Sequence, residues 1–309
     1  MRALKPTRNG KDDSGNERVG VNPSQGTTVR RSFLTSSIFL RVAASVVFIP
    51  CVIVITNTGG YYFLLLINTV IFVGMWEFYR MMEAKGIRPY KMIGILCSLV
   101  LSWYVFFRNG MYANFFLTLV LLVLMCLELT RKETKMAIYH IAVTILGVIY
   151  IGFLGSHLIM LREFPLGLNL DYSMGGSFVL LAFILTWACD TGAYLVGSAI
   201  GKRKLIPRIS GQKTREGSVG GFVFAVAAAL VARETFAGYL ELWHALALGA
   251  IAGVVGQLGD LFESMIKRDV DTKDTSEMIP GHGGVLDRFD SLLFTAPLIY
   301  YFIKFVVFK

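Results

Sequence analysis

Residues 61–79 read Tyr61-Tyr-Phe-Leu-Leu-Leu-Ile-Asn-Thr-Val-Ile-Phe-Val-Gly-Met-Trp-Glu-Phe-Tyr79, a segment made mainly of apolar side chains. A helix needs about 20 predominantly apolar residues to cross the roughly 30 Å hydrocarbon core of a bilayer. The pattern predicts an all-α fold, that of a polytopic integral membrane protein in the lipid bilayer. Comparable segments recur along the chain, and we expect nine spans, at residues 38–57, 61–79, 92–107, 112–128, 137–161, 177–200, 217–233, 240–266 and 290–308.

The composition of the 309-residue chain argues against a soluble fold. Hydrophobic residues make up 55% of it, charged residues only 17%, and the mean hydropathy is +0.60, whereas soluble domains carry about 25% charged residues. Four cysteines lie within apolar segments and form no CxxC pair, so we interpret them as small buried apolar residues rather than disulfide partners or metal ligands. These are Cys51, Cys97, Cys126 and Cys189.

The net charge of +9 is explained by membrane topology, and we expect no nucleic-acid partner. Basic residues are retained on the cytosolic side during insertion. With nine spans and a cytosolic N-terminus, all but five of the 30 basic residues fall on cytosolic segments. The distribution therefore predicts a multi-pass protein with its C-terminus outside and its active site facing the cytosol, in the inner membrane if the source is bacterial. The five exceptions are Arg108, Arg162, Arg233, Lys304 and Lys309.

The chain divides into a polar tail and a membrane domain. Residues 1–36 contain few large apolar side chains and cannot bury enough surface to fold alone, so we expect a flexible cytosolic tail. The tail does not resemble a signal peptide, because the first apolar segment begins late and lacks a small-residue cleavage pattern. Residues 37–309 form one membrane-embedded domain, with N-terminal helices in 37–175 and the catalytic helices and cytosolic loops in 176–309.

One acidic residue, Asp190, lies near the middle of the span at 177–200. A carboxylate at that depth costs at least about 2.5–3.5 kcal/mol unless it faces protein or water. It is either a polar anchor of a substrate site or a structural residue that binds neighbouring hydroxyls or caps a broken helix. Gly192 and Gly197 would let another helix, or a ligand, approach closely.

The cytosolic segment 201–217 is rich in basic residues and hydrogen-bond donors. A basic loop can be a topology signal alone. However, Ser210, Lys213 and Thr214 lie in a glycine-flanked stretch that leads into the span at 217–233, and donors at a helix N-terminus suit phosphate oxygens. The stretch lacks the GxxxxGK[ST] spacing of a P-loop.

The strongest chemical signal begins at Gly259. On a helix, Asp260, Ser264 and Lys267 share one face, at i, i+4 and i+7. Glu263 lies one turn before Lys267 and is placed to pair with it. This face puts acidic groups within the membrane and a lysine at its cytosolic rim.

The segment Pro280-Gly-His-Gly-Gly284 then forms a tight turn with little bulk to block a ligand from the backbone. Asp287, Arg288 and Asp290 follow it. Carboxylates beside lysines and arginines suit a metal-bound polyphosphate, because the acids hold a hard cation and the bases neutralise phosphate. A salt-bridged helix pair with a polar loop is the alternative; it explains the charges but not the glycine-rich turn.

The stretch from Ser264 to Asp290 resembles the signature of the phosphatidate cytidylyltransferases, also called CDP-diacylglycerol synthases. The segment Asp190-Thr-Gly-Ala-Tyr194 resembles the same family. One stretch departs from the family pattern, since Gly211 and Gln212 stand where members usually have Pro and Lys, and we expect a more mobile loop there. The signature positions filled in this chain are Ser264, Lys267, Arg268, Lys273, Asp274, Ser276, Pro280, His282, Gly283, Gly284, Asp287, Arg288 and Asp290.

The resemblance implies transfer of CMP from CTP to phosphatidic acid, which gives CDP-diacylglycerol and pyrophosphate, with Mg²⁺ as cofactor and a second cation left open. It also implies a homodimer, and it assigns metal binding to Asp260 and Asp287. We expect Asp260, Lys267, Asp287 and Arg288 to be catalytic. The candidate substrate-binding residues are Asp190, Ser210, Lys213, Thr214, Ser264, Arg268, Lys273, Asp274, His282, Gly283 and Gly284.

Two other functions remain open from the sequence. A CTP-dependent polyprenol or lipid kinase would use the same nucleotide but attack its γ-phosphate and release CDP. A cation-coupled transporter would use buried acids as ion sites. The glycine-rich turn and the lysines favour nucleotide chemistry over transport, and no inverted repeat is evident.

Overall fold

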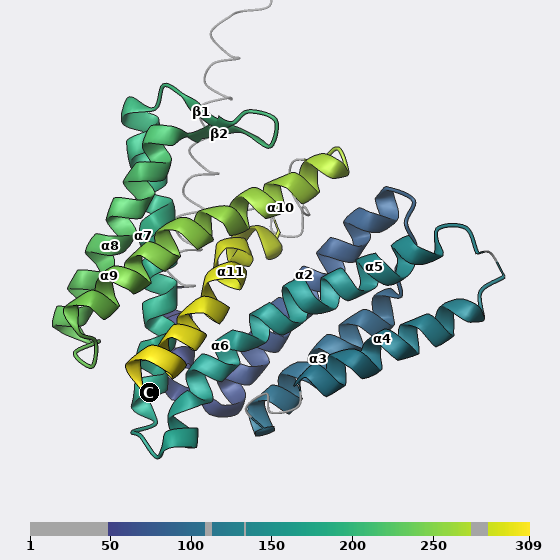
Figure 1. Ribbon diagram of the computed structural model, residues 1–309, viewed down its shortest axis with the longest axis horizontal. Helices are drawn as coiled ribbons and strands as arrows, with labels where there is room; N and C mark the ends of the chain where they lie inside the picture. Colours follow the sequence, from purple (N-terminus) through teal and green to yellow (C-terminus); the bar gives the residue numbers. More distant parts are fainter. Residues whose placement is uncertain (1–48, 109–112, 133, 273–283) are drawn as a thin grey trace, which may run out of the picture. The chain divides into compact units, whose positions relative to one another are not determined.

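The computed structural model describes residues 49–108, 113–132, 134–272 and 284–309, and these are almost entirely helical (Figure 1). The element order confirms an all-α polytopic fold. The helices are α2 (Gly60–Ala84), α3 (Lys91–Arg108), α4 (Ala113–Leu129), α5 (Ala137–Gly147), η1 (Val148–Phe153), α6 (Leu154–Glu163), η2 (Phe164–Leu168), α7 (Ser173–Ile200), α8 (Arg215–Thr235), α9 (Leu242–Ile251), η3 (Ala252–Gly256), α10 (Gln257–Asp269), α11 (Leu286–Phe302) and η4 (Ile303–Val307).

Seven of the helical segments in the described residues are long and apolar enough to cross a bilayer. Two of them are composite, since α5, η1, α6 and η2 form Ala137–Leu168, and α9, η3 and α10 form Leu242–Asp269. The helices Ile49–Thr58 and Ala113–Leu129 are apolar but shorter. The count of nine spans therefore stays a prediction, although a described helix lies within or over each of the nine ranges.

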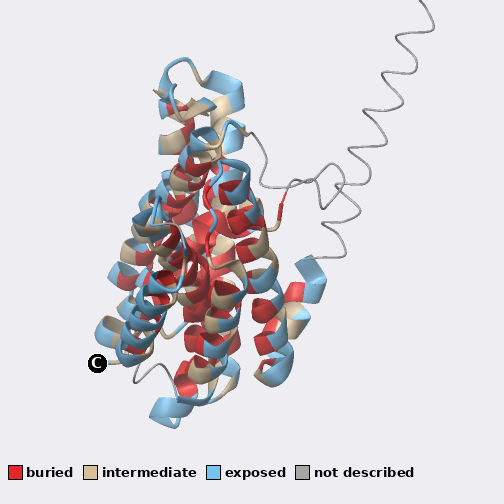
Figure 2. Cartoon of the chain, turned by 90° about the vertical axis from the view of Figure 1, so that its right-hand side faces the viewer, coloured by how far each residue is buried: buried red, intermediate tan, exposed pale blue. Residues whose placement is uncertain are grey.

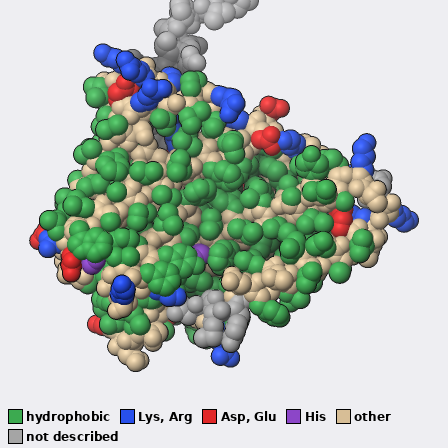
Figure 3. All heavy atoms as spheres, in the orientation of Figure 1, with side chains coloured by type: hydrophobic (Ala, Val, Ile, Leu, Met, Phe, Trp, Pro, Cys, Tyr) green, Lys and Arg blue, Asp and Glu red, His purple; other side chains and the backbone are tan. Residues whose placement is uncertain are grey.

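Apolar side chains cover most of the face shown in Figure 3, and charged side chains gather along its margins. Buried residues concentrate between the helices (Figure 2). Cys189 is buried, as expected, but Cys51 and Cys126 are exposed, which corrects our interpretation of them. Both lie on apolar helices, where a small thiol is as stable against lipid as against protein.

Glycines bring α7, α8 and η3 into close contact. A Cβ added at Gly192 would lie 2.5 Å from Phe224 Cβ, and one added at Gly217 would lie 3.0 Å from Gly197 Cα. The expectation that Gly192 and Gly197 admit a neighbouring helix is therefore confirmed, and that helix is α8. Such small-residue contacts are the usual way for membrane helices to pack.

The segment 201–217 contains a small antiparallel hairpin, where we expected only a loop. Strand β1 (Lys204–Ile206) pairs with β2 (Ser210–Thr214). Glu216, in the first turn of α8, accepts hydrogen bonds from the backbone N–H groups of Lys202 (3.1 Å) and Arg203 (3.2 Å). These bonds tie the start of the hairpin to the start of α8, and β2 contacts α7, α8 and α10.

A buried arginine joins three segments at the far end of α6. The guanidinium of Arg162 donates to the backbone oxygens of Thr56 (2.7 Å), Asn57 (3.0 Å) and Tyr172 (3.0 Å). Glu163 accepts a hydrogen bond from the Tyr172 hydroxyl at 2.8 Å. Burial, followed by this bond, raises the pKa of Tyr172, so the hydroxyl remains a donor.

Replacing Arg162 by Gln is expected to destabilise the protein by about 3 kcal/mol or more, because three charge-assisted hydrogen bonds of a fully buried guanidinium to backbone carbonyl groups are lost. Thermal unfolding in detergent micelles should show the melting temperature falling by roughly 5 °C or more. The matched control is Arg108→Gln, at the exposed end of α3. An equal melting temperature for the two variants would contradict this role of Arg162.

Candidate functional site

The candidate site lies where β2, α10 and the start of α11 meet. Lys213, from β2, forms an ion pair with Asp260 of α10. The side chains of both residues are partly exposed, at 25% and 31%. On α10, the Ser264 hydroxyl lies 3.4 Å from Asp260 Oδ1, as the shared helix face predicts. The hairpin therefore places a cation against the first acid of the signature helix.

A second lysine joins α10 to α11. Lys267 Nζ lies 2.5 Å from Glu263 Oε2 and 2.7 Å from Asp287 Oδ1. The predicted pairing of Glu263 with Lys267 is confirmed. Asp287 Oδ2 also accepts a hydrogen bond from the backbone N–H of Gly284 at 2.8 Å. This second pair is more enclosed than the first, with exposed fractions of 13% for Lys267 and 14% for Asp287.

Two further carboxylates surround the first pair. Asp290 of α11 is buried, and its Oδ1 accepts the Ser291 N–H at 2.5 Å. Asp190 is exposed on α7, which continues unbroken through it, so the helix-cap interpretation of Asp190 is wrong. Asp190, Asp260, Asp290 and Lys213 are close enough to interact electrostatically. From the sequence, Asp290 is a signature position and one of the carboxylates suited to a metal-bound polyphosphate, with no individual role predicted.

The N-terminal half also contributes to the site, which the sequence analysis missed. Glu77 of α2 is buried, and its carboxylate accepts the backbone N–H groups of Val285 (3.1 Å) and Leu286 (2.9 Å) at the start of α11. The only signal for it in the sequence was an acid within an apolar segment.

Tyr150 of η1 is buried near the acidic residues of α10 and α11, which are Asp260, Glu263, Asp287 and Asp290. Its ring packs edge-on against Phe262 and Phe294, with centroids 5.2 and 6.0 Å apart. Its hydroxyl has no hydrogen-bond partner within the described part of the chain. Both η1 and η3 are π-helical, and such insertions are frequent at functional sites.

Comparison with known sequences identifies the family of the chain. Residues 39–306 match the sequence model of the cytidylyltransferase family. The chain belongs to the cytidylyltransferase family. A phosphatidate cytidylyltransferase of Synechocystis sp. is 37% identical over 85% of this chain and 95% of its own length. One of Bacillus subtilis is 35% identical over 84% and 94%, and one of Haemophilus influenzae 45% identical over 43% and 48%.

The structure places the remaining described candidates on β2, α10 and α11. Thr214 is the N-cap of α8, and its hydroxyl accepts the Gly217 N–H at 3.1 Å. Ser210 begins β2, opposite Ile206, while Arg268 donates to the Thr272 carbonyl group at 3.1 Å. Arg288 is exposed on the first turn of α11. Six residues of the family signature lie outside the described residues, namely Lys273, Asp274, Ser276, Pro280, His282 and Gly283.

The carboxylates of the site bear on the divalent cation that members of this family are expected to use. No group of three or more His, Cys, Asp or Glu side chains in the described residues could hold a metal ion alone. Mg²⁺, however, is usually bound by one or two carboxylates together with substrate phosphates. Asp260 and Asp287 supply such carboxylates, each next to a lysine that can neutralise phosphate. The residues present therefore fit a metal that binds with a nucleotide.

Close contact between α10 and α11 sets the spacing of these acids. A Cβ added at Gly259 would lie 2.7 Å from the backbone oxygen of Asp290, which cannot move without moving α11. We expect Gly259→Ala to lower activity at least about tenfold, because small displacements of catalytic groups are costly. Gly211→Ala is the control, since a Cβ there meets nothing within 4 Å. Equal initial rates of the two variants would contradict the prediction.

Proposed function

We propose that the chain is a phosphatidate cytidylyltransferase, which transfers CMP from CTP to phosphatidic acid and releases pyrophosphate. The proposal rests mainly on sequence similarity: two relatives that bear this name match the chain over most of its length and most of their own. The two lysine–carboxylate pairs supply the chemistry the reaction needs, since two highly anionic substrates must be brought together.

The reaction needs no strong general base, because the phosphate of phosphatidic acid is already an anion near neutral pH. A phosphate oxygen of that lipid attacks the α-phosphorus of CTP, and the bond to the β-phosphate oxygen breaks as pyrophosphate leaves. Positioning and electrostatic stabilisation therefore account for most of the catalysis. Lys213, Lys267, Arg268 and Arg288 would hold the phosphates.

Asp260 and Asp287 would hold Mg²⁺, which would supply Lewis-acid stabilisation of charge on the phosphates; a second cation remains a proposal as well. Lys213 and Lys267, each now paired with one of these carboxylates, would turn their ammonium groups to the phosphates when the nucleotide is bound. Asp190 would serve as a further polar anchor, exposed on α7 beside Asp260.

A reaction with CTP labelled in the cytosine ring tests the proposal. Purified protein with Mg²⁺ and phosphatidic acid should place the label in the lipid extract and release pyrophosphate, and excess pyrophosphate should reverse the reaction. A lipid kinase would instead leave labelled CDP in water. A transporter would give neither product. Diacylglycerol is the control lipid, because it lacks the anionic nucleophile.

We also propose that the site faces the cytosol, in the inner membrane of a bacterial cell, and that the protein is a homodimer. The orientation rests on the distribution of basic residues. In a cysteine-free background, an impermeant thiol reagent added to sealed cells should label Gly167→Cys but not Ser210→Cys. Labelling of Ser210→Cys from outside would overturn the orientation. Light scattering in detergent tests the dimer.

A further inference from the structure

Glu77 accepts two hydrogen bonds from a part of the chain far from its own position in the sequence. Its side chain is 1% exposed, and both carboxylate oxygens accept backbone N–H groups more than 200 residues away, at Val285 and Leu286. These are two of the N–H groups that every helix leaves unsatisfied at its N-terminus.

Within the described residues, α11 begins without a side-chain cap hydrogen bond from its own N-cap position. The N-cap position is Val285, which has no side-chain acceptor, whereas helices usually begin with Ser, Thr, Asp or Asn there. A carboxylate at a helix N-terminus also interacts favourably with the helix dipole. Glu77 therefore does from α2 what a local cap does in most helices.

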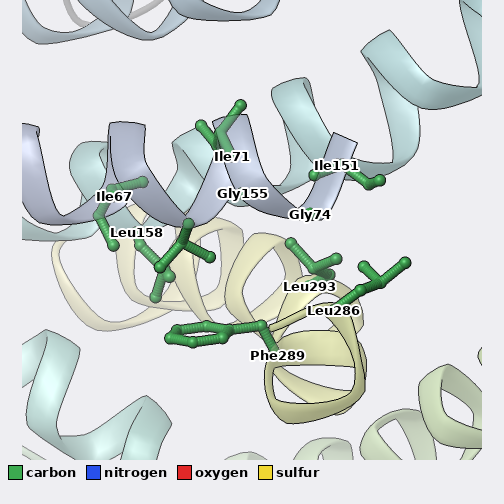
Figure 4. A pocket seen from close by; sticks show the side chains of 10 residues that line it. Ile67, Ile71, Gly74, Ile151, Gly155, Leu158, Leu286, Phe289 and Leu293 are labelled. Carbon is green, nitrogen blue, oxygen red and sulfur yellow. The ribbon is translucent and has the colours of Figure 1, made fainter. Parts of the chain in front are cut away.

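Apolar side chains also join α2 to α11. Figure 4 shows these side chains around an apolar pocket between the two helices. Apolar packing is not directional, so it holds the helices together without fixing where α11 begins. The hydrogen bonds of Glu77 supply that direction. The lining residues from the two helices are Ile67, Val70, Ile71 and Gly74 on α2 and Leu286, Phe289 and Leu293 on α11.

We propose that Glu77 is a positioning residue of the cytidylyl-transfer site, which fixes the start of α11 and thereby the place of Asp287. The proposal rests on the proposed function. Asp287 is the second residue of α11, and its carboxylate joins Lys267 to the Gly284 N–H. A shift in the first turn of α11 would move this carboxylate relative to Lys267 and to the phosphates it serves.

The test is a double-mutant cycle on the rate of CDP-diacylglycerol formation. Glu77→Gln keeps the shape of the side chain but replaces one acceptor by a donor that faces a backbone N–H group. We expect a loss of at least about tenfold in kcat. Glu83→Gln is the matched control on α2, because Glu83 is partly exposed and pairs with Lys91 instead; it should stay within about twofold of the unmodified protein.

Measuring Glu77→Gln in two mutant backgrounds distinguishes a positioning role from a general effect on folding. In an Asp287→Asn background, Glu77→Gln should lower kcat by less than about a further twofold, because the group that Glu77 positions has already lost its charge. In a Lys213→Met background, Glu77→Gln should lower kcat by the same factor as in the otherwise unmodified protein. An equal factor in both backgrounds, or a Glu77→Gln variant as active as Glu83→Gln, would overturn the proposal. An unmodified protein that makes no CDP-diacylglycerol would overturn the proposed function as well.

A second variant keeps the test valid if Glu77→Gln does not fold. Val285→Pro removes one of the N–H groups that Glu77 binds and leaves the carboxylate in place. The φ angle of Val285 is −67°, which proline adopts, and proline is well tolerated where a helix begins. We expect a loss of about fivefold, again suppressed by Asp287→Asn, and a loss that persists in that background would overturn the proposal.

Discussion

Replacing Asp287 by Asn should lower the turnover of CDP-diacylglycerol synthesis at least about a hundredfold, the cost of removing a principal electrostatic group from an active site. Asn keeps the size of the side chain and still accepts the Gly284 N–H bond. It removes the negative charge that Lys267 contacts at 2.7 Å and that a hard cation requires.

The effect should be on chemistry rather than on folding. Lys267 retains Glu263 as an ion-pair partner at 2.5 Å in the variant, so no buried cation is left uncompensated. The melting temperature in detergent should therefore change little while kcat falls. Asp271→Asn is the matched control, because Asp271 is exposed and has a φ angle of 55°, which Asn tolerates well. Near-normal turnover of Asp287→Asn would remove this residue from the active site.

The apolar segments predict most of the fold, because the requirement to span a bilayer fixes both the length and the composition of a helix. The predicted 177–200 span, for example, corresponds to α7 at Ser173–Ile200. The hairpin at Lys204–Thr214 was missed because its three- and five-residue strands are too short to show a polar alternation. The two strands pair with each other, and Glu216 fixes the residues just before β1 through hydrogen bonds from Lys202 and Arg203 that no local pattern encodes.

In the candidate site, too, contacts within one helix could be predicted from the sequence, whereas contacts between distant segments could not. The helical spacing of Asp260, Ser264 and Lys267, and the pairing of Glu263 with Lys267, follow from one helix and were predictable. Glu77 could not be assigned to the site because its partners at Val285 and Leu286 lie in another part of the chain. Long-range contacts of this kind depend on how α2 packs against α11, which a single sequence does not specify.

Asp260 and Lys213 are expected to act as a unit. The losses in kcat/KM caused by replacing each of them should therefore be strongly non-additive. Asp260→Asn and Lys213→Met should each lower kcat/KM by about a hundredfold. If the two residues acted independently, the double variant would lose about ten thousandfold. We expect it to lose less than about a thousandfold, because groups that act together are grossly non-additive.

The physical reason lies in what each single variant leaves behind. Removing Lys213 leaves the carboxylate of Asp260 near those of Asp190 and Asp290 without its cation, and the acids then repel the phosphates of the nucleotide. Removing Asp260 leaves the ammonium group without its anchor on α10, so the hairpin no longer holds it in place. The double variant removes the repulsion and the misplaced charge together, so part of each penalty disappears.

The more exposed ion pair between Asp269 of α10 and Lys85 provides the control for this cycle. Asp269 pairs with Lys85 of the neighbouring segment, and the two side chains are 61% and 38% exposed. Such exposed pairs are worth about 0–1 kcal/mol, so Asp269→Asn, Lys85→Met and their combination should each change kcat/KM by less than about threefold. If the losses at Asp260 and Lys213 instead multiply within about threefold, the two residues serve separate steps, and the ion pair between β2 and α10 is not part of the catalytic arrangement.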